Sequence, residues 1–239
     1  MFIFINIILL LSGINKINGD DGRAGASASS TDVGVGCFSG DSLVILNNGQ
    51  QKQIDHLKTA DEILGVNHFK IIPSEMIIML DKQTSKQGKF YTFITDSGHK
   101  ISLTSLHLIP IKYNNNNKID YIPAKDLQLN DKLYVIINGK LKSSPVRNIT
   151  IEIKRGYFAP LTMTGTLFVN NVLSSCYASA KSHKWAHLFL TPFRWYYKIG
   201  RFFSINQPFG NYQTDGIHWI FEIIYKFVNY IQPSILHQL

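Results

Sequence analysis

The sequence predicts an all-β fold, and two observations support that prediction. Short runs rich in β-branched and aromatic residues follow one another along most of the chain, with turn-forming residues between them. The second observation is a short internal repeat, which indicates that two similar β units are built from one chain.

The predicted strands follow the chain order. They are residues 42–46, 75–80, 90–95, 100–111, 133–137, 146–153 and 165–173. Asn48-Gly49 and Asn138-Gly139 are dipeptides that tolerate positive φ and therefore predict tight hairpins. Residues 96–98 and 114–117 predict looser turns.

The repeat relates residues 57–63 to residues 127–133, at an offset of 70 residues. The two segments share a leucine, an aspartate and an apolar residue two positions after that aspartate. Two copies favour an intertwined β unit with a pseudo-twofold axis over a solenoid, which needs about three copies or more. At the same offset Cys37 corresponds to His107, so the repeat predicts that both lie near one centre.

The N-terminal residues predict targeting and disorder. Residues 1–19 have a short apolar core and are typical of a secretory signal peptide, being much shorter than the ~20 apolar residues of a membrane-spanning helix. We therefore expect the chain in the secretory pathway, in the lumen of the endoplasmic reticulum, with its product secreted or at the cell surface. Residues 20–36 are rich in Gly, Ala, Ser and Asp and predict a disordered peptide.

Composition narrows the possible partners. The net charge of +8 includes no dense run of Lys and Arg, so nucleic acid is not an expected partner, whereas an anionic membrane surface is compatible with the charge. His183 and His187 are spaced as neighbours on a helix but have no third ligand in view, so no metal is expected.

The composition changes after residue 180. Residues 181–239 hold 15 of the 29 aromatic residues of the chain in a quarter of its length. Apolar residues then recur at helical spacing and predict an amphipathic helix; they are Ile217, Ile220, Phe221, Ile224, Val228 and Ile231. Such a face packs against a core or a partner, or lies on a membrane surface.

The chemistry centres on Gly36 and Cys37. A thiol directly after a glycine can attack the carbonyl of its own preceding peptide bond, because glycine hinders that attack least. An N-to-S acyl shift would convert the amide into a thioester. The alternative is a disulfide with Cys176, since two cysteines in a secreted chain commonly pair.

Thr104 and His107 supply groups that an acyl shift needs. A histidine can protonate or polarise the departing amide nitrogen near neutral pH, and a nearby hydroxyl can orient the peptide. Both residues lie within the predicted strand 100–111. The spacing by itself is a weak signal, and a buried or surface histidine with no chemical role is the alternative.

In combination, motifs from residue 36 onwards resemble the C-terminal autoprocessing domain of Hedgehog proteins, the Hint or Hog domain, whose core inteins share. These motifs are Gly36-Cys37-Phe38, Asp81, Thr104 with His107, Ala159-Pro160-Leu161-Thr162, Gly165-Thr166, Asn170, Val172-Leu173, Ser175-Cys176-Tyr177-Ala178, Trp185-Ala186-His187, Thr191-Pro192-Phe193-Arg194 and Gly216-Ile217-His218-Trp219. The resemblance implies a Hint domain over residues 37–180 and a sterol-recognition-like region over residues 181–239.

The resemblance also implies a role for each matching residue. Cys37 would be the nucleophile, Thr104 and His107 would assist the acyl shift, and Asp81 would be the base that activates a sterol hydroxyl. Cys176 would be an auxiliary or redox partner of Cys37. The implied reaction is cholesterolysis, in which the segment ending at the cleavage site is transferred to a sterol, with no cofactor other than that second substrate.

The resemblance does not extend to the Hedgehog signalling domain, since only residues 20–36 separate the predicted signal peptide from Cys37. We therefore expect a short sterol-tagged peptide as the product. The alternative function is a non-catalytic secreted protein that binds a lipid or a partner and contains a Cys37–Cys176 disulfide.

Overall fold

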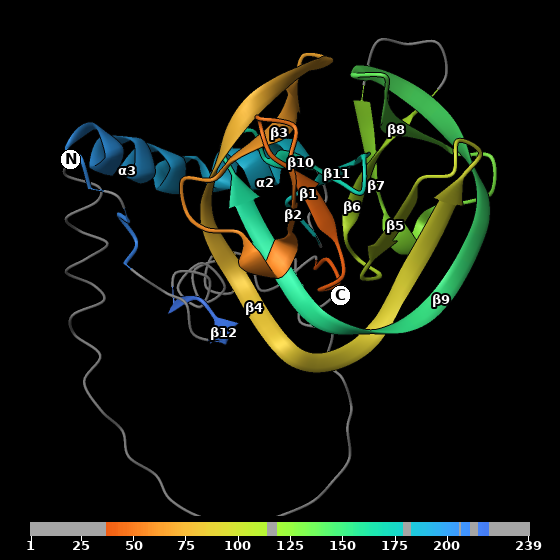
Figure 1. The fold of residues 1–239 in the computed structure, drawn as a ribbon, viewed down its shortest axis with the longest axis horizontal. Helices are drawn as coiled ribbons and strands as arrows, with labels where there is room; N and C mark the ends of the chain where they lie inside the picture. Colours follow the sequence, from red (N-terminus) through yellow and green to blue (C-terminus); the bar gives the residue numbers. More distant parts are fainter. Residues whose placement is uncertain (1–36, 114–118, 179–182, 206, 211–214, 220–239) are drawn as a thin grey trace, which may run out of the picture. The chain divides into compact units, whose positions relative to one another are not determined.

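A computed structural model describes residues 37–113, 119–178, 183–205, 207–210 and 215–219 (Figure 1). The strands are β1 Leu43–Ile45, β2 Gln51–Gln53, β3 Glu62–Asn67, β4 Lys70–Thr95, β5 Lys100–Leu103, β6 Leu108–Lys112, β7 Ile119–Pro123, β8 Lys132–Ile137, β9 Lys140–Thr162, β10 Thr166–Val169, β11 Val172–Ser175 and β12 Gly216–Ile217. The helices are the 3₁₀ turns η1 Ile54–His56 and η2 Ala124–Asp126 and the α-helices α2 His183–Phe189 and α3 Thr191–Phe202.

Two long strands organise the architecture. β4 and β9 pair antiparallel over most of their length, from Met76↔Thr162 to Thr95↔Val146, and curve together around the other strands (Figure 1). β3 pairs with the start of β4, and β8 pairs with the start of β9. The all-β prediction is therefore confirmed.

The internal repeat is present in three dimensions. In both copies a 3₁₀ turn, η1 or η2, precedes the shared leucine. The side chains of Asp61 and Asp131 then accept a hydrogen bond from the amide three residues earlier, at 2.7 and 2.8 Å. Ala60 and Asn130, which precede these aspartates, have the same φ of 71°. The two halves therefore have equivalent local geometry, as a pseudo-twofold fold requires.

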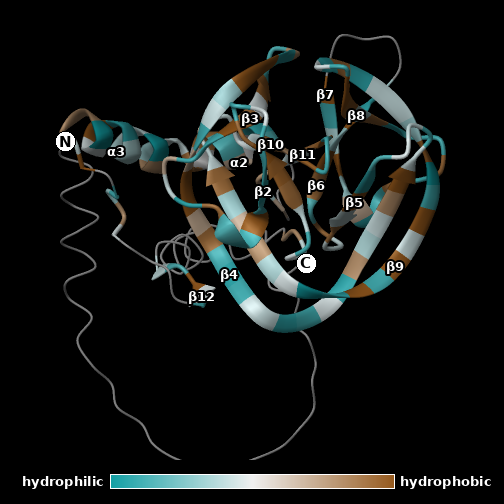
Figure 2. Ribbon diagram, in the orientation of Figure 1, coloured by the Kyte–Doolittle hydropathy of each residue, from teal (hydrophilic) through white to brown (hydrophobic). Residues whose placement is uncertain are grey.

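Burial follows the alternation of apolar and polar residues along the long strands. Figure 2 shows apolar residues towards the two ends of β4 and polar residues in its middle. Residues 85–87 are exposed, whereas Phe90 and Phe93 are completely buried. Burying an aromatic or aliphatic side chain of this size contributes about 1.5–3 kcal/mol, so the C-terminal part of β4 is held in the core.

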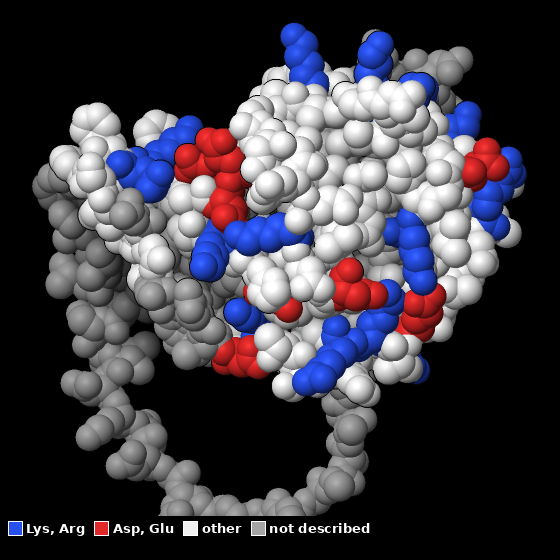
Figure 3. Space-filling view, viewed as in Figure 1, with Lys and Arg blue, Asp and Glu red and all other residues white. Residues whose placement is uncertain are grey.

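Most charged side chains of the described residues lie on the outside, with Asp81 and Arg194 as buried exceptions. Basic and acidic residues are interspersed over the face that Figure 3 shows. Several of them form ion pairs, such as Lys52 with Asp61 at 2.6 Å and Arg147 with Asp96 at 2.9 Å.

Two predicted strands are interrupted in the structure. The run 100–111 was predicted as one strand, but residues 104–107 form a turn between β5 and β6, closed by a 3.1 Å hydrogen bond from the His107 amide to the Thr104 carbonyl. The run 165–173 is a hairpin of β10 and β11, because Asn170 and Asn171 both adopt positive φ.

The C-terminal prediction needs one correction. Helices α2 and α3 confirm a helical, aromatic-rich tail, but Ile217 lies in β12 and not in a helix, because its backbone pairs antiparallel with Asp81 of β4. The other positions of that predicted helix lie outside the described residues, as do residues 1–36 and the predicted turn 114–117. Within the described ranges, no helix combines the length and hydrophobicity needed to cross a bilayer.

Candidate active site

Cys37 begins the described chain, and its side chain is only 2% exposed. The next residue fixes its position: the Phe38 amide donates to the Phe158 carbonyl at 2.9 Å, and the Phe158 amide donates back at 3.0 Å. Phe38 is completely buried. Cys37 is therefore held against β9 inside the core.

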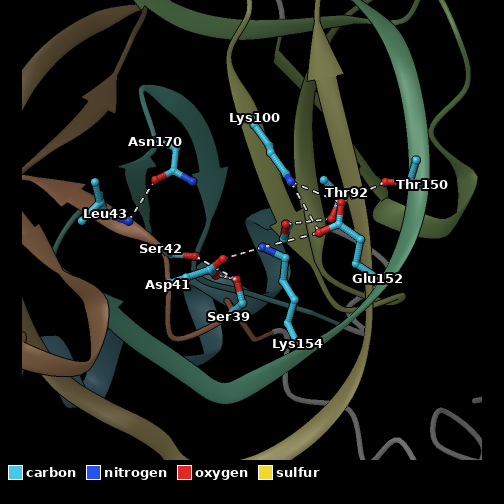
Figure 4. A network of polar contacts seen from close by, with 11 residues as sticks. Ser39, Asp41, Ser42, Leu43, Thr92, Lys100, Thr150, Glu152, Lys154 and Asn170 are labelled. Carbon is cyan, nitrogen blue, oxygen red and sulfur yellow. Dashed lines mark hydrogen bonds and ion pairs between the residues drawn. The ribbon is translucent and has the colours of Figure 1, made fainter.

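A network of polar contacts anchors the segment after Phe38 (Figure 4). The Ser39 hydroxyl donates to Asp41 at 2.5 Å, and Lys154 Nζ lies 2.6 Å from the other carboxylate oxygen of Asp41. Burial alone would raise the pKa of Asp41, but the hydrogen bonds from Lys154 and Ser39 lower it below its ordinary value. Asp41 is thus ionised at neutral pH and attaches this segment to β9.

Thr104 makes two hydrogen bonds to the backbone of Cys37. The Cys37 amide donates to Thr104 Oγ1 at 3.0 Å, and the Thr104 amide donates to the Cys37 carbonyl at 3.2 Å. The nitrogen of Cys37 is the nitrogen of the Gly36–Cys37 peptide bond, although Gly36 itself lies outside the described residues. The hydroxyl of Thr104 therefore orients the amide that an acyl shift would break.

His107 packs against Phe38 and is completely buried. Its ring contacts the Phe38 ring edge-on, with 4.5 Å between centroids. Its Nε2 is 2.9 Å from the Ser175 carbonyl oxygen and 3.1 Å from the Ser174 hydroxyl. A carbonyl can only accept, so Nε2 carries a proton and, in the neutral ring, Nδ1 is the basic nitrogen.

Asp81 approaches the thiol of Cys37 from β4, with 3.9 Å between Oδ2 and Sγ. It sits at an irregularity in the β4–β9 ladder, where Met79 faces Pro160 and Lys82 faces Phe158, so that β4 has one extra residue. A β-bulge of this kind re-aims a side chain. Asp81 is 4% exposed, and this burial raises its pKa above the ordinary value.

The family model described as the Hint module matches residues 23–233. The chain belongs to the Hint family.

The relatives of this Hint chain include hedgehog proteins. The Sonic hedgehog protein of Danio rerio is 32% identical over 215 residues, which are 85% of this chain and 51% of that protein. Protein hedgehog of Drosophila virilis is 29% identical over 213 residues, which are 83% of this chain and 44% of that protein. The chain thus spans about half the length of these relatives.

Among solved structures, a DnaB intein from Synechocystis sp. PCC 6803 matches with a TM-score of 0.50 and 20% identity, covering 61% of this chain and 99% of the intein. This likeness shows the shared fold. Hint family membership, with hedgehog proteins among the relatives, supports an autoprocessing activity for the chain.

Cys176 lies in a different environment from Cys37 in the Hint fold. Its sulfur is 3.4 Å from Thr162 Oγ1, and burial raises the pKa of its thiol to about 11. Both cysteines are thiols in the structure, and no disulfide occurs among the described residues. At neutral pH the Cys176 thiol is therefore protonated and a poor nucleophile.

A second polar cluster attaches helix α2 to the Hint core. His183 stacks on Tyr121 with 3.9 Å between centroids, and His187 Nδ1 hydrogen-bonds with the Tyr177 hydroxyl at 2.8 Å. Arg194 also donates to that hydroxyl. In the described part of the chain no group of three or more metal-ligating side chains gathers, around these histidines or elsewhere.

Two cavities, of about 580 and 450 Å³, open beside this cluster. β3 and the two α-helices line both cavities, β4 lines the first, and β7 and β10 line the second. Their linings share Asn67, Thr164 and His187. Neither lining includes any of the four candidate residues, Cys37, Asp81, Thr104 and His107. The four candidate residues therefore lie inside the Hint core and outside these two cavities.

Sequence reasoning missed Gln83 and the contact of Ser174 and Ser175, at the end of β11, with His107. Gln83 Nε2 donates to both carboxylate oxygens of Asp81, at 2.9 and 2.8 Å. The spacing of two residues could have indicated it, since residues i and i+2 of a strand share a face. Nothing in the linear order indicates that Ser174 and Ser175 contact His107.

We expect Asp81→Asn to stabilise the folded chain at neutral pH. Burial raises the native pKa of Asp81 above the ordinary value of 3.8, so the folded state binds this proton more tightly than the unfolded state does. The ionised carboxylate therefore lowers stability as pH rises from ~4 through the native pKa. Asparagine has the same shape without the charge. Thermal unfolding should give a higher midpoint for the variant at pH 7 and equal midpoints below pH ~3.5; a lower midpoint at pH 7 would contradict this account.

Proposed function

We propose that the chain cleaves itself at Gly36–Cys37 through an internal thioester and then transfers the N-terminal segment to the hydroxyl of a sterol. The observation that carries the proposal is the pair of hydrogen bonds between Cys37 and Thr104, with the Asp81 carboxylate 3.9 Å from the Cys37 sulfur. Family membership supports the first step, and the second depends on the role of Asp81.

In the first step the sulfur of Cys37 attacks the carbonyl carbon of Gly36, the C–N bond breaks, and the nitrogen of Cys37 leaves as an amine. The hydrogen bond from the Cys37 amide to Thr104 Oγ1 holds this nitrogen in place. Holding the reacting groups in a fixed geometry raises their effective molarity and so increases the rate of the reaction. The Cys37 thiol loses its proton to Nδ1 of the His107 ring, and His107 then supplies that proton to the leaving nitrogen.

In the second step the hydroxyl of the alcohol loses its proton to Asp81, and its oxygen attacks the thioester carbonyl. The C–S bond breaks, and Cys37 leaves as a thiolate, which regains a proton. A carboxylate whose pKa is raised by burial is a stronger base than an exposed one, and it matches the weak acidity of an alcohol better.

The tail supports a lipid as the second substrate. Helix α3 turns Tyr197 and Arg194 inwards, where the Tyr197 hydroxyl donates to Glu75 at 2.8 Å and Arg194 Nε donates to the Thr162 carbonyl at 3.3 Å. Its opposite face exposes large apolar side chains, which are Trp195, Tyr196, Ile199 and Phe202. An exposed apolar helix face next to exposed lysine and arginine is typical of contact with an anionic membrane surface.

The proposal also places the reaction in the secretory pathway, at the membrane surface. Residues 1–19 are typical of a signal peptide, and the matched relatives are hedgehog proteins. Sterol transfer in the secretory pathway, at the membrane surface and without a cofactor, is consistent with these features.

Cys37→Ala should abolish cleavage, because no other thiol can form the thioester. His107→Ala should slow cleavage induced by dithiothreitol by about 10²- to 10⁴-fold, as is usual when acid–base assistance is lost. Gel electrophoresis and N-terminal sequencing of the fragment beginning at Cys37 would measure both. Wild-type cleavage by the His107 variant would remove this residue from the mechanism, and a wild-type chain that stays intact would favour the non-catalytic alternative.

Asp81→Ala should retain cleavage by dithiothreitol and lose transfer to cholesterol. A thiol is partly ionised near neutral pH and needs little help from a base, whereas a sterol hydroxyl is not ionised there. Mass spectrometry of the released peptide, with cholesterol as the added alcohol, would detect the sterol ester. A sterol ester formed at the wild-type rate would overturn the assignment of the base, and loss of thiol cleavage would move Asp81 into the first step.

The exposed face of α3 should be needed for the membrane and not for the thioester. Replacing Trp195, Ile199 and Phe202 with serine should reduce flotation with vesicles of phosphatidylserine, phosphatidylcholine and cholesterol, while cleavage by dithiothreitol continues. The matched control is the replacement of Ile151 and Ile153, which are 60% and 64% exposed on β9, with serine. Equal vesicle binding by both variants would show that α3 is not the contact.

A further inference from the structure

Among the residues that the structure describes, Gln83 is the close side-chain donor to the carboxylate of Asp81 besides the thiol of Cys37. The amide of Gln83 donates from the same nitrogen to both carboxylate oxygens, at 2.9 Å to Oδ1 and 2.8 Å to Oδ2. The second oxygen is also the one that faces the sulfur, at 3.9 Å. The Gln83 amide group therefore fixes the orientation of the Asp81 carboxylate, with Oδ2 directed at the sulfur of Cys37.

The backbone around the bulge explains why Gln83 can reach both oxygens. Asp81 and Gln83 are two residues apart on β4, and the ladder resumes at Lys82↔Phe158 and Gln83↔Tyr157 directly after the extra residue. On the other edge of β4, β12 pairs Ile217 with Asp81. Both backbone edges of this part of β4 are thus occupied, and the two side chains are held on one side of the strand.

The charged groups near Asp81 neutralise the negative charge of its carboxylate only weakly. On β4, Lys82 contributes through its backbone and Lys86 through a long-range charge that lowers the pKa of Asp81. Next to β12, burial lowers the pKa of His218, so its ring is neutral at pH 7, and the Asp215 carboxylate accepts a 2.5 Å hydrogen bond from the Thr84 hydroxyl. On β9, Arg155 donates to the Thr84 carbonyl.

We propose that Gln83 is the positioning residue for the second step: its amide keeps the Asp81 carboxylate ionised and aimed at the thioester. This inference rests on the proposed function. The proton of the attacking alcohol passes to Asp81, the new C–O bond forms, the C–S bond breaks, and Asp81 returns the proton to the Cys37 thiolate. Because the Gln83 amide bonds both oxygens, it still holds one of them after the other is protonated.

This role has a consequence for the pH dependence of sterol transfer. A hydrogen bond to the charged form of an acid lowers its pKa, and here it opposes the effect of burial. Without the amide, the carboxylate would stay protonated to a higher pH and would be unable to act as a base. The rising limb of the pH profile should then move to higher pH.

Gln83→Leu tests this, because leucine keeps much of the volume and removes the donor. The rate of sterol ester formation in the full chain, measured by mass spectrometry from pH 5 to 9 with cholesterol, should show a rising limb about one to two pH units higher than in the wild type. At neutral pH the rate should fall about tenfold or more, with partial recovery at high pH. Cleavage by dithiothreitol, measured in parallel, monitors folding and the first step.

Two further variants sharpen the test. Gln83→Glu replaces the donor with a second carboxylate and should move the limb further, because two adjacent carboxylates cannot both ionise easily. Gln87→Leu is the matched control, since Gln87 is an exposed glutamine four residues along the same strand and pairs with Arg155. It should keep the wild-type profile.

The outcomes separate the inference from the function on which it rests. If the wild type forms no sterol ester, the proposed function fails. If the wild type forms the ester and Gln83→Leu has the wild-type pH profile, the inference is overturned. A uniform loss of rate at every pH, or an equal loss of thiol cleavage, would show a structural role only and would equally overturn it.

Discussion

The antiparallel pairing of β4 with β9 is the constraint on which the site depends. Phe38 joins β9 at Phe158 and so fixes the thiol that precedes it, while Lys82 of β4 faces the same Phe158. Cys37 and Asp81 are therefore anchored to one position of one ladder, although 44 residues separate them in sequence. The bulge next to this position turns Asp81 towards the sulfur. A strand pair without the extra residue would carry the carboxylate in another direction.

The site places polar groups where a stable core would have apolar ones. Asp81, Thr104 and His107 are all buried, and each is held by hydrogen bonds from a different part of the chain. A buried carboxylate costs free energy unless donors stabilise it. Buried polar side chains with a shifted pKa or a fixed orientation are common at functional sites, where both properties serve the chemistry. The polar interior of this fold is consistent with a reaction carried out on its own backbone.

The C-terminal region is built into the domain rather than attached beside it. Arg194 hydrogen-bonds to the Thr162 carbonyl at the end of β9, and Thr162 in turn contacts the sulfur of Cys176. β12 adds a strand to β4 at Asp81 itself. The same region therefore has one face that completes the core near the proposed base and another, on α3, that exposes aromatic side chains. A tail arranged in this way combines an exposed aromatic surface and a strand beside Asp81 in one unit.

Much of the fold could be predicted from the sequence, because local patterns have local physical causes. Alternating apolar residues predicted the strands, Asn138-Gly139 predicted a hairpin in which both residues have positive φ, and the shared leucine and aspartate predicted two equivalent halves. The turn at residues 104–107 was missed because its residues also suit a strand; the hydrogen bonds to Cys37 favour the turn instead. Ile217 was predicted in a helix because its spacing fits one, but pairing with the open edge of β4 satisfies its backbone as a strand. The residue types of the site, a thiol after glycine with threonine, histidine and aspartate, were determined by the sequence alone. The tertiary structure decided the distances between these residues, the burial of Asp81 and its contact with Gln83. The physical reason is that only the packing of β4 against β9 determines which distant side chains are buried next to one another.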